Sequence, residues 1–476
     1  MNRRTKILTT LGPASDTAKV LTEMIRAGVD VVRINFSHGS VEDHAKRVQR
    51  VRDAAKAAGK WVGVLGDLQG PKIRIERFAE GKVNLSEGDE FTLDVSLNPD
   101  DGTAKAVGVA YKGLPKDLRP GDVLLLNDGQ IVLNVKQVDG PRIQTEVAVG
   151  GELSDHKGIN RKGGGLSAGA LTDKDRADIK MAAQLGVDYL AVSFAREAGD
   201  INEARRLFRE AGSTGLLVAK IERSEAIDNL TEIIKASDVV MVARGDLGVE
   251  MGYAELTGLQ KHIIAETRKH NRVVITATQM MESMIHNPIP TRAEVSDVAN
   301  AVMDGTDAVM LSGESAVGKY PVKAVQAMDE IITGAEKYEI AHMPVRHRIE
   351  GGFERTDEAI AMAVMYTANH LKVKAIVALT ESGSTPLWMS RIRADIPIYA
   401  FTRHEATRSR VTLYRGVYPV AFDITNANPE VMYPEIFSVL LQRKLVEVGN
   451  LIILTKGEMT GVSGKTNSMK ILDVRA

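Results

Sequence analysis

The sequence predicts a (β/α)8 barrel, an α/β fold in which eight parallel strands alternate with helices. Eight short segments are rich in Val, Ile and Leu without polar alternation, as in parallel strands buried on both faces, and most are separated by stretches of helical composition. A charged or metal-capable residue lies at or just past the end of almost every segment. Because such barrels build their active sites from the carboxyl ends of the strands, these residues predict the position of the site.

The eight predicted strands follow one another along the chain. They lie in the segments TKILTTLGP, VDVVRINFSHG, WVGVLGDLQG, DYLAVSFAR, LLVAKIERSE, DVVMVARGDLG, RVVITATQMME and DAVMLSGES. The residues that we expect to converge on one mouth of the barrel are Arg33, Asn35, Ser37, Asp67, Lys220, Glu222, Asp246, Thr278 and Glu314.

The barrel pattern is interrupted after the third strand. Residues 71–167 contain short alternating runs, such as EFTLDV and RIQTEVAV, separated by Asp-Gly and Gly-Asp turns. They predict a small β-barrel lid domain, inserted at the catalytic face between barrel parts 1–70 and 168–340. The run Gly163-Gly164-Gly165 near its return is either a hinge or a plain flexible loop.

Residues 341–476 predict a C-terminal doubly wound α/β domain. The polar segment AHMPVRHRIEGGFERTDE is typical of a linker. A helical pattern from Asp357 to Leu371 follows, and then come the strand segments KAIVALTES, IPIYAFT, GVYPVAF, NLIILTKG and SMKILDV. Ligands of such a domain bind at the carboxyl ends of its strands.

The composition excludes several classes of function. The 61 basic and 62 acidic residues nearly cancel, so no overall field attracts nucleic acid or an anionic membrane. The absence of cysteine excludes disulfides, thiolate catalysis and Cys-ligated zinc. We find no signal peptide and no apolar stretch long enough to span a bilayer, and therefore expect a cytoplasmic protein.

A metal site is predicted at Glu222 and Asp246, which end the fifth and sixth strands. Two carboxylates with open coordination positions are how Mg2+ is normally held. The alternative is a surface pair bridged to Arg223 and Arg244. Lys220 precedes Glu222 by two residues, so both side chains point to one side of the strand, where the lysine serves either a substrate or a structural salt bridge.

Three further features point to anion binding at the mouth. Alternation places Arg33, Asn35 and Ser37 on one wholly polar face of the second strand, which a core strand would not accept without ligands. If the turn around Gly245 opens a helix, its backbone N–H groups form a cradle for carboxylate or phosphate. Thr278 offers a hydroxyl, but threonine is common in strands, so this residue alone decides nothing.

These residues resemble one family, pyruvate kinase, over essentially the whole chain. The segments that carry the resemblance are KILTTLGPAS, VRINFSHG, LGDLQGPKIR, AKIERSEA, VMVARGDLGVE, ITATQMMESM, NPIPTRAEVSDVANAV and DAVMLSGESAVGKYP. The resemblance implies a glycolytic transferase that converts phosphoenolpyruvate and ADP into pyruvate and ATP. It also implies Mg2+, with Mn2+ as a substitute, a homotetramer, and a C-terminal domain that binds an allosteric effector.

The resemblance assigns roles to the residues at the mouth. Arg33 and Lys220 would hold the transferring phosphoryl group, while Glu222 and Asp246 would bind the metal. The N–H groups of Gly245 and Asp246 would grip the substrate carboxylate. The remaining assignments are Thr278 in the relay that protonates the enolate, Ser312 and Glu314 beside it, and Asn35, His38, Arg74 and Lys157 at the nucleotide.

One departure from the family concerns its monovalent cation. Animal enzymes that need K+ have Thr-Lys-Gly-Pro-Glu after the aspartate of the third strand, whereas this chain has the segment 68–72, Leu68-Gln69-Gly70-Pro71-Lys72. We expect the ammonium of Lys72 to take the electrostatic role of K+ beside Asn35, Ser37 and Asp67, so that K+ is not required.

The resemblance places an allosteric phosphate site in the C-terminal domain. The predicted loop comprises Thr380, Ser382, Gly383, Ser384 and Thr385, between a strand and a helical stretch. Ser384 stands where many relatives have a basic residue and Glu381 is acidic, which favours a sugar or nucleotide monophosphate over a bisphosphate. A capped helix start without a ligand is the alternative.

Two other functions fit parts of the sequence. Barrels with a Mg2+-binding Glu/Asp pair also act as lyases or aldolases on 2-oxo acids through enolates, but such an enzyme has no nucleotide for a lid to cover. A catalytically inactive homologue is the other possibility, and the presence of every motif residue argues against it.

Overall fold

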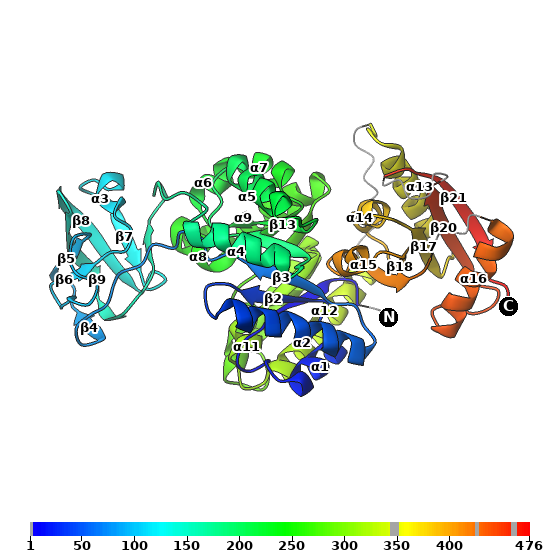
Figure 1. Ribbon diagram of the computed structural model, residues 1–476, viewed down its shortest axis with the longest axis horizontal. Helices are drawn as coiled ribbons and strands as arrows, with labels where there is room; N and C mark the ends of the chain where they lie inside the picture. Colours follow the sequence, from blue (N-terminus) through cyan, green and yellow to red (C-terminus); the bar gives the residue numbers. More distant parts are fainter. Residues whose placement is uncertain (1–2, 343–351, 424–427, 458–463) are drawn as a thin grey trace.

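The computed structural model describes residues 3–342, 352–423, 428–457 and 464–476. Three units follow one another along its long axis: a β-rich unit, a barrel and an α/β domain (Figure 1). The predicted fold class is therefore confirmed. Residues 343–351 of the predicted linker lie outside the described residues.

The central unit is a closed barrel of eight parallel strands, in the order β1-β16-β15-β14-β13-β12-β3-β2. Its strands are β1 (Lys6–Thr10), β2 (Val31–Asn35), β3 (Gly63–Asp67), β12 (Tyr189–Val192), β13 (Leu216–Ile221), β14 (Val239–Ala243), β15 (Val273–Ala277) and β16 (Ala308–Leu311). All eight lie in the predicted segments. Alternate residues pack on opposite faces: Ile7 and Val64 lie under the helices, and Leu8 and Leu65 lie in the interior cluster.

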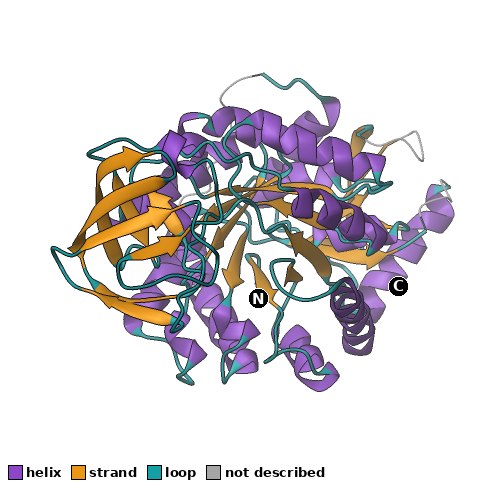
Figure 2. Ribbon diagram, turned by 60° about the vertical axis from the view of Figure 1, so that its left-hand side comes forward, coloured by secondary structure: helices purple, strands orange, loops and turns teal. Residues whose placement is uncertain are grey.

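Helices surround these strands (Figure 2). They are α1 (Ala18–Ala27), α2 (Val41–Ala58), α4 (Asp173–Gln184), α5 (Ala198–Glu210), α6 (Ser224–Asp228), α7 (Leu230–Ala236), α8 (Arg244–Met251), α9 (Tyr253–Lys269), η1 (Glu282–Ile285), α10 (Arg292–Asp304), α11 (Gly313–Ala316) and α12 (Pro321–His342). Capping boxes fix several starts; in α2, Ser40 accepts from the N–H of Asp43, whose carboxylate accepts from the N–H of Ser40.

The inserted unit has its own core. Its strands are β4 (Lys82–Leu85), β5 (Glu90–Asp94), β6 (Ala106–Gly108), β7 (Val123–Leu126), β8 (Ile131–Asp139), β9 (Arg142–Val149), β10 (Gly151–Ser154) and β11 (Ile159–Arg161), with the short helix α3 (Leu114–Asp117). They form a six-stranded sheet, β11-β7-β8-β9-β5-β6, and the pair β10-β4. Buried Phe91, Leu124 and Ile143 lie in its separate apolar cluster, so the unit can remain folded while its position over the barrel changes.

The C-terminal domain is a five-stranded sheet in the order β19-β18-β17-β20-β21, parallel except for the last pair. Its elements are α13 (Thr356–His370), β17 (Ala375–Leu379), α14 (Ser384–Ser390), β18 (Ile398–Thr402), α15 (Glu405–Val411), β19 (Val417–Ala421), α16 (Pro429–Gln442), β20 (Leu451–Gly457) and β21 (Thr466–Asp473). Val364 and Met389 join the same apolar cluster as Leu8 and Leu65, so the domain packs firmly against the barrel. Among the described residues, no helix is long and apolar enough to cross a membrane.

Candidate active site

Two strand-end cations share one buried carboxylate at the barrel mouth. Arg33 Nε lies 2.5 Å from Asp67 Oδ2, and Lys220 Nζ lies 3.4 Å from Asp67 Oδ1. Lys220 Nζ is also 2.9 Å from Glu222 Oε1, because residues two apart on β13 point to the same side. The structure thus brings together four of the predicted residues as a continuous ionic network.

Burial and the neighbouring charges in this network shift the pKa values of its members. Burial lowers the pKa of Lys220, but Asp67 and Glu222 more than offset this and leave the pKa raised. Burial raises the pKa of Asp67, but Lys220 and Arg33 bring it below its ordinary value. For Glu222 burial prevails: its pKa is raised, against the ammonium of Lys220 and with the nearby charge of Asp246 adding to the effect. Glu222 therefore gains from a further cation, which is the behaviour of a metal ligand.

Two residues that sequence reasoning missed complete the network. Ser193 Oγ accepts a hydrogen bond from Lys220 Nζ at 2.6 Å and donates to the carbonyl of Leu68 at 2.8 Å. The N–H of Phe194 donates to Glu222 Oε2 at 2.8 Å, from a backbone with φ of 56°. Positive φ is costly for an aromatic residue, and the ordinary segment SFA after β12 gives no sign of it.

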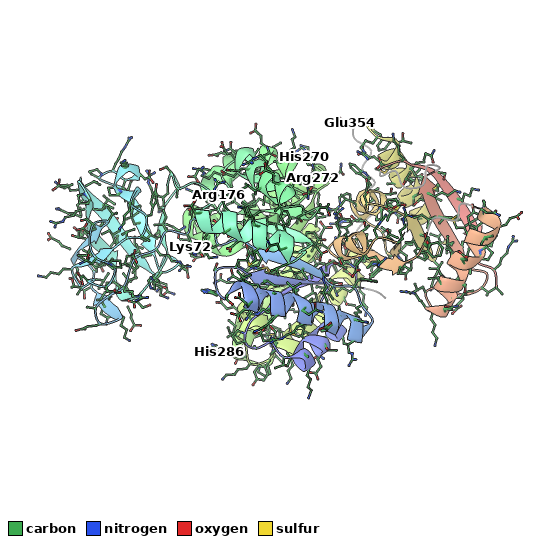
Figure 3. All side chains as sticks on the ribbon, viewed as in Figure 1. Lys72, Arg176, His270, Arg272, His286 and Glu354 are labelled. Atoms are coloured by element: carbon green, nitrogen blue, oxygen red, sulfur yellow. The ribbon has the colours of Figure 1, made fainter. Side chains whose placement is uncertain are left out.

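Asp246 lies at the start of α8, beside the strand that ends in Glu222. Its carboxylate is half-buried, and Lys72 Nζ lies 2.9 Å from its Oδ1. Figure 3 labels Lys72 on the barrel side of the β-rich unit.

The ammonium of Lys72 pairs with Asp246, and the expectation that it takes the role of K+ beside Asn35, Ser37 and Asp67 stays a prediction. Asp67 is held by Arg33 and Lys220, and the N–H of Ser37 donates to Asn35 Oδ1 at 3.1 Å. The chain turns at Gly70, with φ of 66°, and then leaves the barrel, and two residues later Lys72 reaches Asp246 at the start of α8.

The alternative of a surface carboxylate pair bridged to Arg223 and Arg244 is wrong. Glu222 is only 2% exposed. Arg223 binds the carbonyl of Leu166 and the carboxylate of Glu225, whereas Arg244 pairs with Asp297 at 2.7 Å. Both arginines therefore leave the Glu222–Asp246 pair open to another cation.

The start of α8 meets the end of β15 at Thr278. The helix opens at Arg244 as the cradle hypothesis requires, and the N–H of Gly245 donates to Thr278 Oγ1 at 2.8 Å. Thr278 has φ of 70° and Gln279 has φ of 52°, in a region that β-branched residues rarely adopt. Arg244 donates to the carbonyl of Thr278 at 2.8 Å, which helps to hold this conformation. Strain of this kind is typical of functional sites.

Glu314 and Ser312 lie on the loop after β16. The carboxylate of buried Glu314 accepts from the N–H groups of Met281 at 3.0 Å and Ser312 at 2.7 Å, so it ties together the loops that follow β15 and β16. Burial raises the pKa of Glu314. Ser312 Oγ is buried and finds no hydrogen-bond partner among the described residues, which suits a group that meets a ligand.

The predicted nucleotide residues come from two sides of the mouth. His38 is exposed after β2 on the barrel, and Asn35 is half-buried below it. Arg74 and Lys157 belong to the inserted unit, where the segments 73–75 and 157–159 pair antiparallel and Arg74 donates to the carbonyl of His156 at 2.8 Å. A nucleotide held by all four residues would therefore join barrel and lid.

The lid returns to the barrel at a clasp that the sequence analysis missed. Glu250, at the end of α8, accepts from Asn160 Nδ2 at 3.3 Å and from the N–H of Ser224 at 3.0 Å, while its carbonyl accepts from the N–H of Gly163 at 3.2 Å. The residues of the run 163–165 have φ of 81°, 75° and 89°. These positive φ values favour glycine at all three positions, and both the hinge and the plain loop stay open as predictions.

The predicted effector loop follows β17 and ends at the start of α14. Thr380 Oγ1 accepts from the N–H of Gly383 at 2.9 Å, Ser384 Oγ donates to Asp357 at 3.0 Å, and Thr385 Oγ1 lies 2.6 Å from Thr466 Oγ1. Glu381 is paired with Arg403 and His404. The hydroxyls of Thr380, Ser384 and Thr385 are thus already engaged within the domain.

A closed barrel with fixed cations beside a carboxylate pair, and with an inserted unit at its mouth, fits an enzyme of the phosphotransferase class. Family models agree with this class. The model for the barrel domain of pyruvate kinase matches residues 2–325, and that for its alpha/beta domain matches residues 358–472. The chain belongs to the pyruvate kinase family.

Similar proteins extend over the whole length. The chain is 55% identical over 476 residues to pyruvate kinase II of Salmonella typhimurium, with 99% of each chain covered. It is 52% identical to pyruvate kinase of Haemophilus influenzae, with 96% of each covered, and 41% identical to that of Mycobacterium tuberculosis, with 99% of this chain and 98% of the relative covered. The chain is accordingly a phosphotransferase that converts phosphoenolpyruvate and ADP into pyruvate and ATP, and the lyase alternative is not favoured.

Proposed function

We propose that phosphoryl transfer takes place between the cations Arg33 and Lys220 and the carboxylates Glu222 and Asp246. The observation that carries this proposal is the shared contact of Arg33 and Lys220 with buried Asp67, which fixes two positive charges side by side at the mouth. The transferring group carries negative charge on its equatorial oxygens, and preorganised cations stabilise it without reorganisation.

Glu222 and Asp246 would hold Mg2+ or Mn2+. Both donors are carboxylate oxygens, the ligands that Mg2+ prefers, and the raised pKa of Glu222 shows a carboxylate with charge to be neutralised. Among the described residues no group of three or more His, Asp or Glu could hold a metal ion by itself, so substrate oxygens and water would complete the coordination. When bound, the metal would neutralise charge on the substrate carboxylate and phosphoryl group.

The remaining residues of the mouth position the substrate and handle its proton. The ammonium of Lys220 neutralises the charge that develops on the bridging oxygen. The N–H groups of Gly245 and Asp246 bind the substrate carboxylate at the start of α8. Thr278, whose hydroxyl lies 2.8 Å from the nitrogen of Gly245, belongs with water to the relay that protonates the enolate methylene. Ser312 and Glu314 line the same side.

The nucleotide binds between barrel and lid. Asn35 and His38 contact it from the barrel, and Arg74 and Lys157 contact its phosphates from the lid. Closure of the lid excludes water, which matters because hydrolysis of phosphoenolpyruvate is the competing reaction.

The enzyme does not require K+. What supports this is the ion pair of Lys72 with Asp246, which places a tethered positive charge at the mouth that also carries the cation-site equivalents Asn35, Ser37, Asp67 and Leu68. A K+ ion about 4 Å from this ammonium would be repelled by about 4 kcal/mol at an effective dielectric of about 20.

The C-terminal domain regulates a cytoplasmic homotetramer through a sugar or nucleotide monophosphate. The loop 380–385 precedes α14, and buried Gly383 has φ of 85°, a conformation that suits glycine at a tight turn before a helix. Ser384 must leave Asp357 to bind the phosphate, and Glu381 disfavours a second phosphate group. Binding is thereby coupled to a rearrangement of the domain.

One coupled assay tests the proposed reaction. Pyruvate should form from phosphoenolpyruvate only when ADP and Mg2+ are both present, and chelation should abolish it. Formation of pyruvate at the same rate without ADP would show a phosphatase or lyase activity instead.

A further inference from the structure

The face between the barrel and the C-terminal domain contains a cluster of buried charges that the phosphotransfer reaction does not use. The cluster surrounds a cavity that offers about 20 Å³ to a water-sized particle. Its cations are Arg4, Arg268, Arg391, Arg393 and Arg415. Its carboxylates are Asp307, Glu336 and Glu339. In Figure 3 the neighbouring Arg272, whose carbonyl accepts from Arg391 at 2.6 Å, marks this side of the barrel.

The carboxylates of the cluster are already shared among the arginines. The carboxylate of Asp307 accepts hydrogen bonds from both terminal guanidinium nitrogens of Arg391. Glu339 lies 2.8 Å from Arg415, 3.1 Å from Arg393 and 3.4 Å from Arg4.

Glu336 is likewise committed at the start of β1. It accepts from the N–H of Arg4 at 2.9 Å and from the N–H and hydroxyl of Thr5 at 2.7 and 2.8 Å. Each carboxylate of the cluster therefore already faces at least one arginine, although Oε1 of Glu339, 3.1 Å from Arg393, accepts no hydrogen bond within the described ranges.

Arg268 forms no ion pair within 4 Å among the described residues, and only the more distant charge of Asp307 offsets its own in part. Its hydrogen bonds go to the carbonyls of Gly305 at 3.4 Å and Arg391 at 3.2 Å, which are neutral acceptors. Burial, and then the charges of Arg415 and Arg391, lower the pKa of Arg268 to about 10. Five cations against three carboxylates leave an excess of two positive charges in a poorly solvated place, which is costly unless an anion accompanies them.

Two guanidinium nitrogens of the cluster lack a hydrogen-bond acceptor among the described residues. Arg4 is 5% and Arg415 is 8% exposed, yet one terminal guanidinium nitrogen of Arg415 finds no hydrogen-bond partner within the part of the chain that the structure describes, and Arg4 Nε has only Glu336 at 3.7 Å, beyond hydrogen-bond distance. Both residues line the cavity. Buried donors are nearly always satisfied, so these two call for an acceptor inside it.

We propose that this cavity binds a small monovalent inorganic anion of the chloride class, which joins the barrel to the C-terminal domain. A space of about 20 Å³ holds one particle of about the size of water and not a phosphate with its four oxygens. The residues around it come from both units: Arg4 and Arg268 from the barrel, Arg391 and Arg415 from the C-terminal domain. A bound anion therefore stabilises the interface between them.

Bromide, which replaces chloride and scatters anomalously, locates the site directly. Crystals of the full chain soaked in bromide should show an anomalous peak inside the cavity, in contact with Arg268 and Arg415. A cavity that contains only water, with no anomalous peak, overturns the proposal. This measurement needs no variant and so does not depend on the folding of one.

Thermal unfolding tests the site in solution. Replacing gluconate by chloride at constant ionic strength should raise the unfolding temperature, because an anion at ten times its Kd lowers the unfolding constant about tenfold. Arg268→Gln, which keeps hydrogen-bonding capacity but removes the charge, should lose both this shift and the bromide peak. Arg205→Gln, at a one-to-one ion pair with Asp238, should retain both. Equal unfolding temperatures of the parent in the two salts would contradict the proposal, as would an unchanged chloride shift in Arg268→Gln.

Discussion

The ammonium of Lys72 lies 2.9 Å from Oδ1 of Asp246, so one ion pair joins the base of the lid to a carboxylate of the proposed metal site. Both side chains are about one-fifth exposed, and the pair is therefore only partly screened by water. A divalent ion that binds Asp246 must compete with this ammonium. Occupation of the metal site and the position of the lid base are thus linked.

Lys72→Met should strengthen the binding of Mn2+ in the absence of substrates. Removal of the competing ammonium frees Asp246, and we expect an increase in affinity of about tenfold, or about 1.4 kcal/mol. Electron paramagnetic resonance of free Mn2+ measures the affinity without any turnover. Lys174→Met, at an ion pair with Asp178 on α4, is the matched control and should bind Mn2+ like the parent. An unchanged Mn2+ affinity in Lys72→Met would show that the ion pair does not oppose the metal.

The parent enzyme should reach full activity in buffers that contain only organic cations. The tethered ammonium of Lys72 needs no equilibrium with bulk K+ and repels that ion. Lys72→Glu should acquire at least a partial K+ requirement, limited by the unchanged Leu68 and Gln69. Turnover measured against KCl at constant ionic strength decides the matter, and many-fold activation of the parent by K+ would refute it.

Lys220→Met should fold but lose phosphoryl transfer by several orders of magnitude. The ammonium acts chiefly where charge develops in the transition state, whereas protonation of the enolate depends on Thr278 and water. Exchange of the methyl protons of pyruvate with solvent should therefore survive better than ATP formation. Losses of equal size in the two reactions would contradict the role given to Lys220.

Ser382→Asp should abolish activation by monophosphates while basal turnover remains. A new carboxylate in the loop repels a phosphate, and the loop lies in a different domain from the barrel mouth. The probes are a hexose monophosphate, a pentose monophosphate and AMP, each tested for its effect on half-saturation by phosphoenolpyruvate. Ser438→Asp, on the exposed face of α16, should respond like the parent. A response of Ser382→Asp equal to that of the parent would place the effector elsewhere.

The fold was predictable because its signals are local. A buried parallel strand shows a continuous apolar run, and each of the eight runs became a barrel strand. The same holds for Lys220 and Glu222, whose shared side follows from a period of two residues. Site residues at the carboxyl ends of the strands converge as soon as the barrel topology is known, because all these ends lie at the same face.

What the sequence did not reveal depends on contacts between distant segments. From the sequence, the ammonium of Lys72 could pair with any of several carboxylates. In the folded chain, which turns at Gly70, it pairs with Asp246. Arg4 and Arg391 line the same cavity although nearly the whole barrel separates them in sequence. Neither residue belongs to a motif. Charge excess of this kind becomes visible only when the partners of every arginine are known.

Glu250 should make the stability of the protein depend on pH. Its carboxylate, 4% exposed at the lid clasp, accepts from Asn160 and Ser224. Burial raises its pKa from 4.5 to about 7, against Arg223 and with the charge of Glu225 adding to the effect. Because the pKa of Glu250 in the folded state lies above its unfolded value, the protonated side chain stabilises the folded protein. This stabilisation is fully present below pH 4.5 and is lost as the pH rises through about 7.

Glu250→Gln removes the titration; its amide oxygen can still accept from the N–H of Ser224, and its NH2 group can donate to Asn160 once that side-chain amide turns to present Oδ1. At pH 8 we expect the free energy of unfolding of the variant to exceed that of the parent by an amount on the order of 2–3 kcal/mol, so that the variant unfolds at a higher urea concentration. The difference should shrink toward pH 5. Urea unfolding of both proteins across this range measures the effect. Glu210→Gln, at an exposed ion pair with Arg206, should follow the parent curve at every pH. Parallel curves for Glu250→Gln and the parent would mean that Glu250 does not take up a proton as the clasp forms.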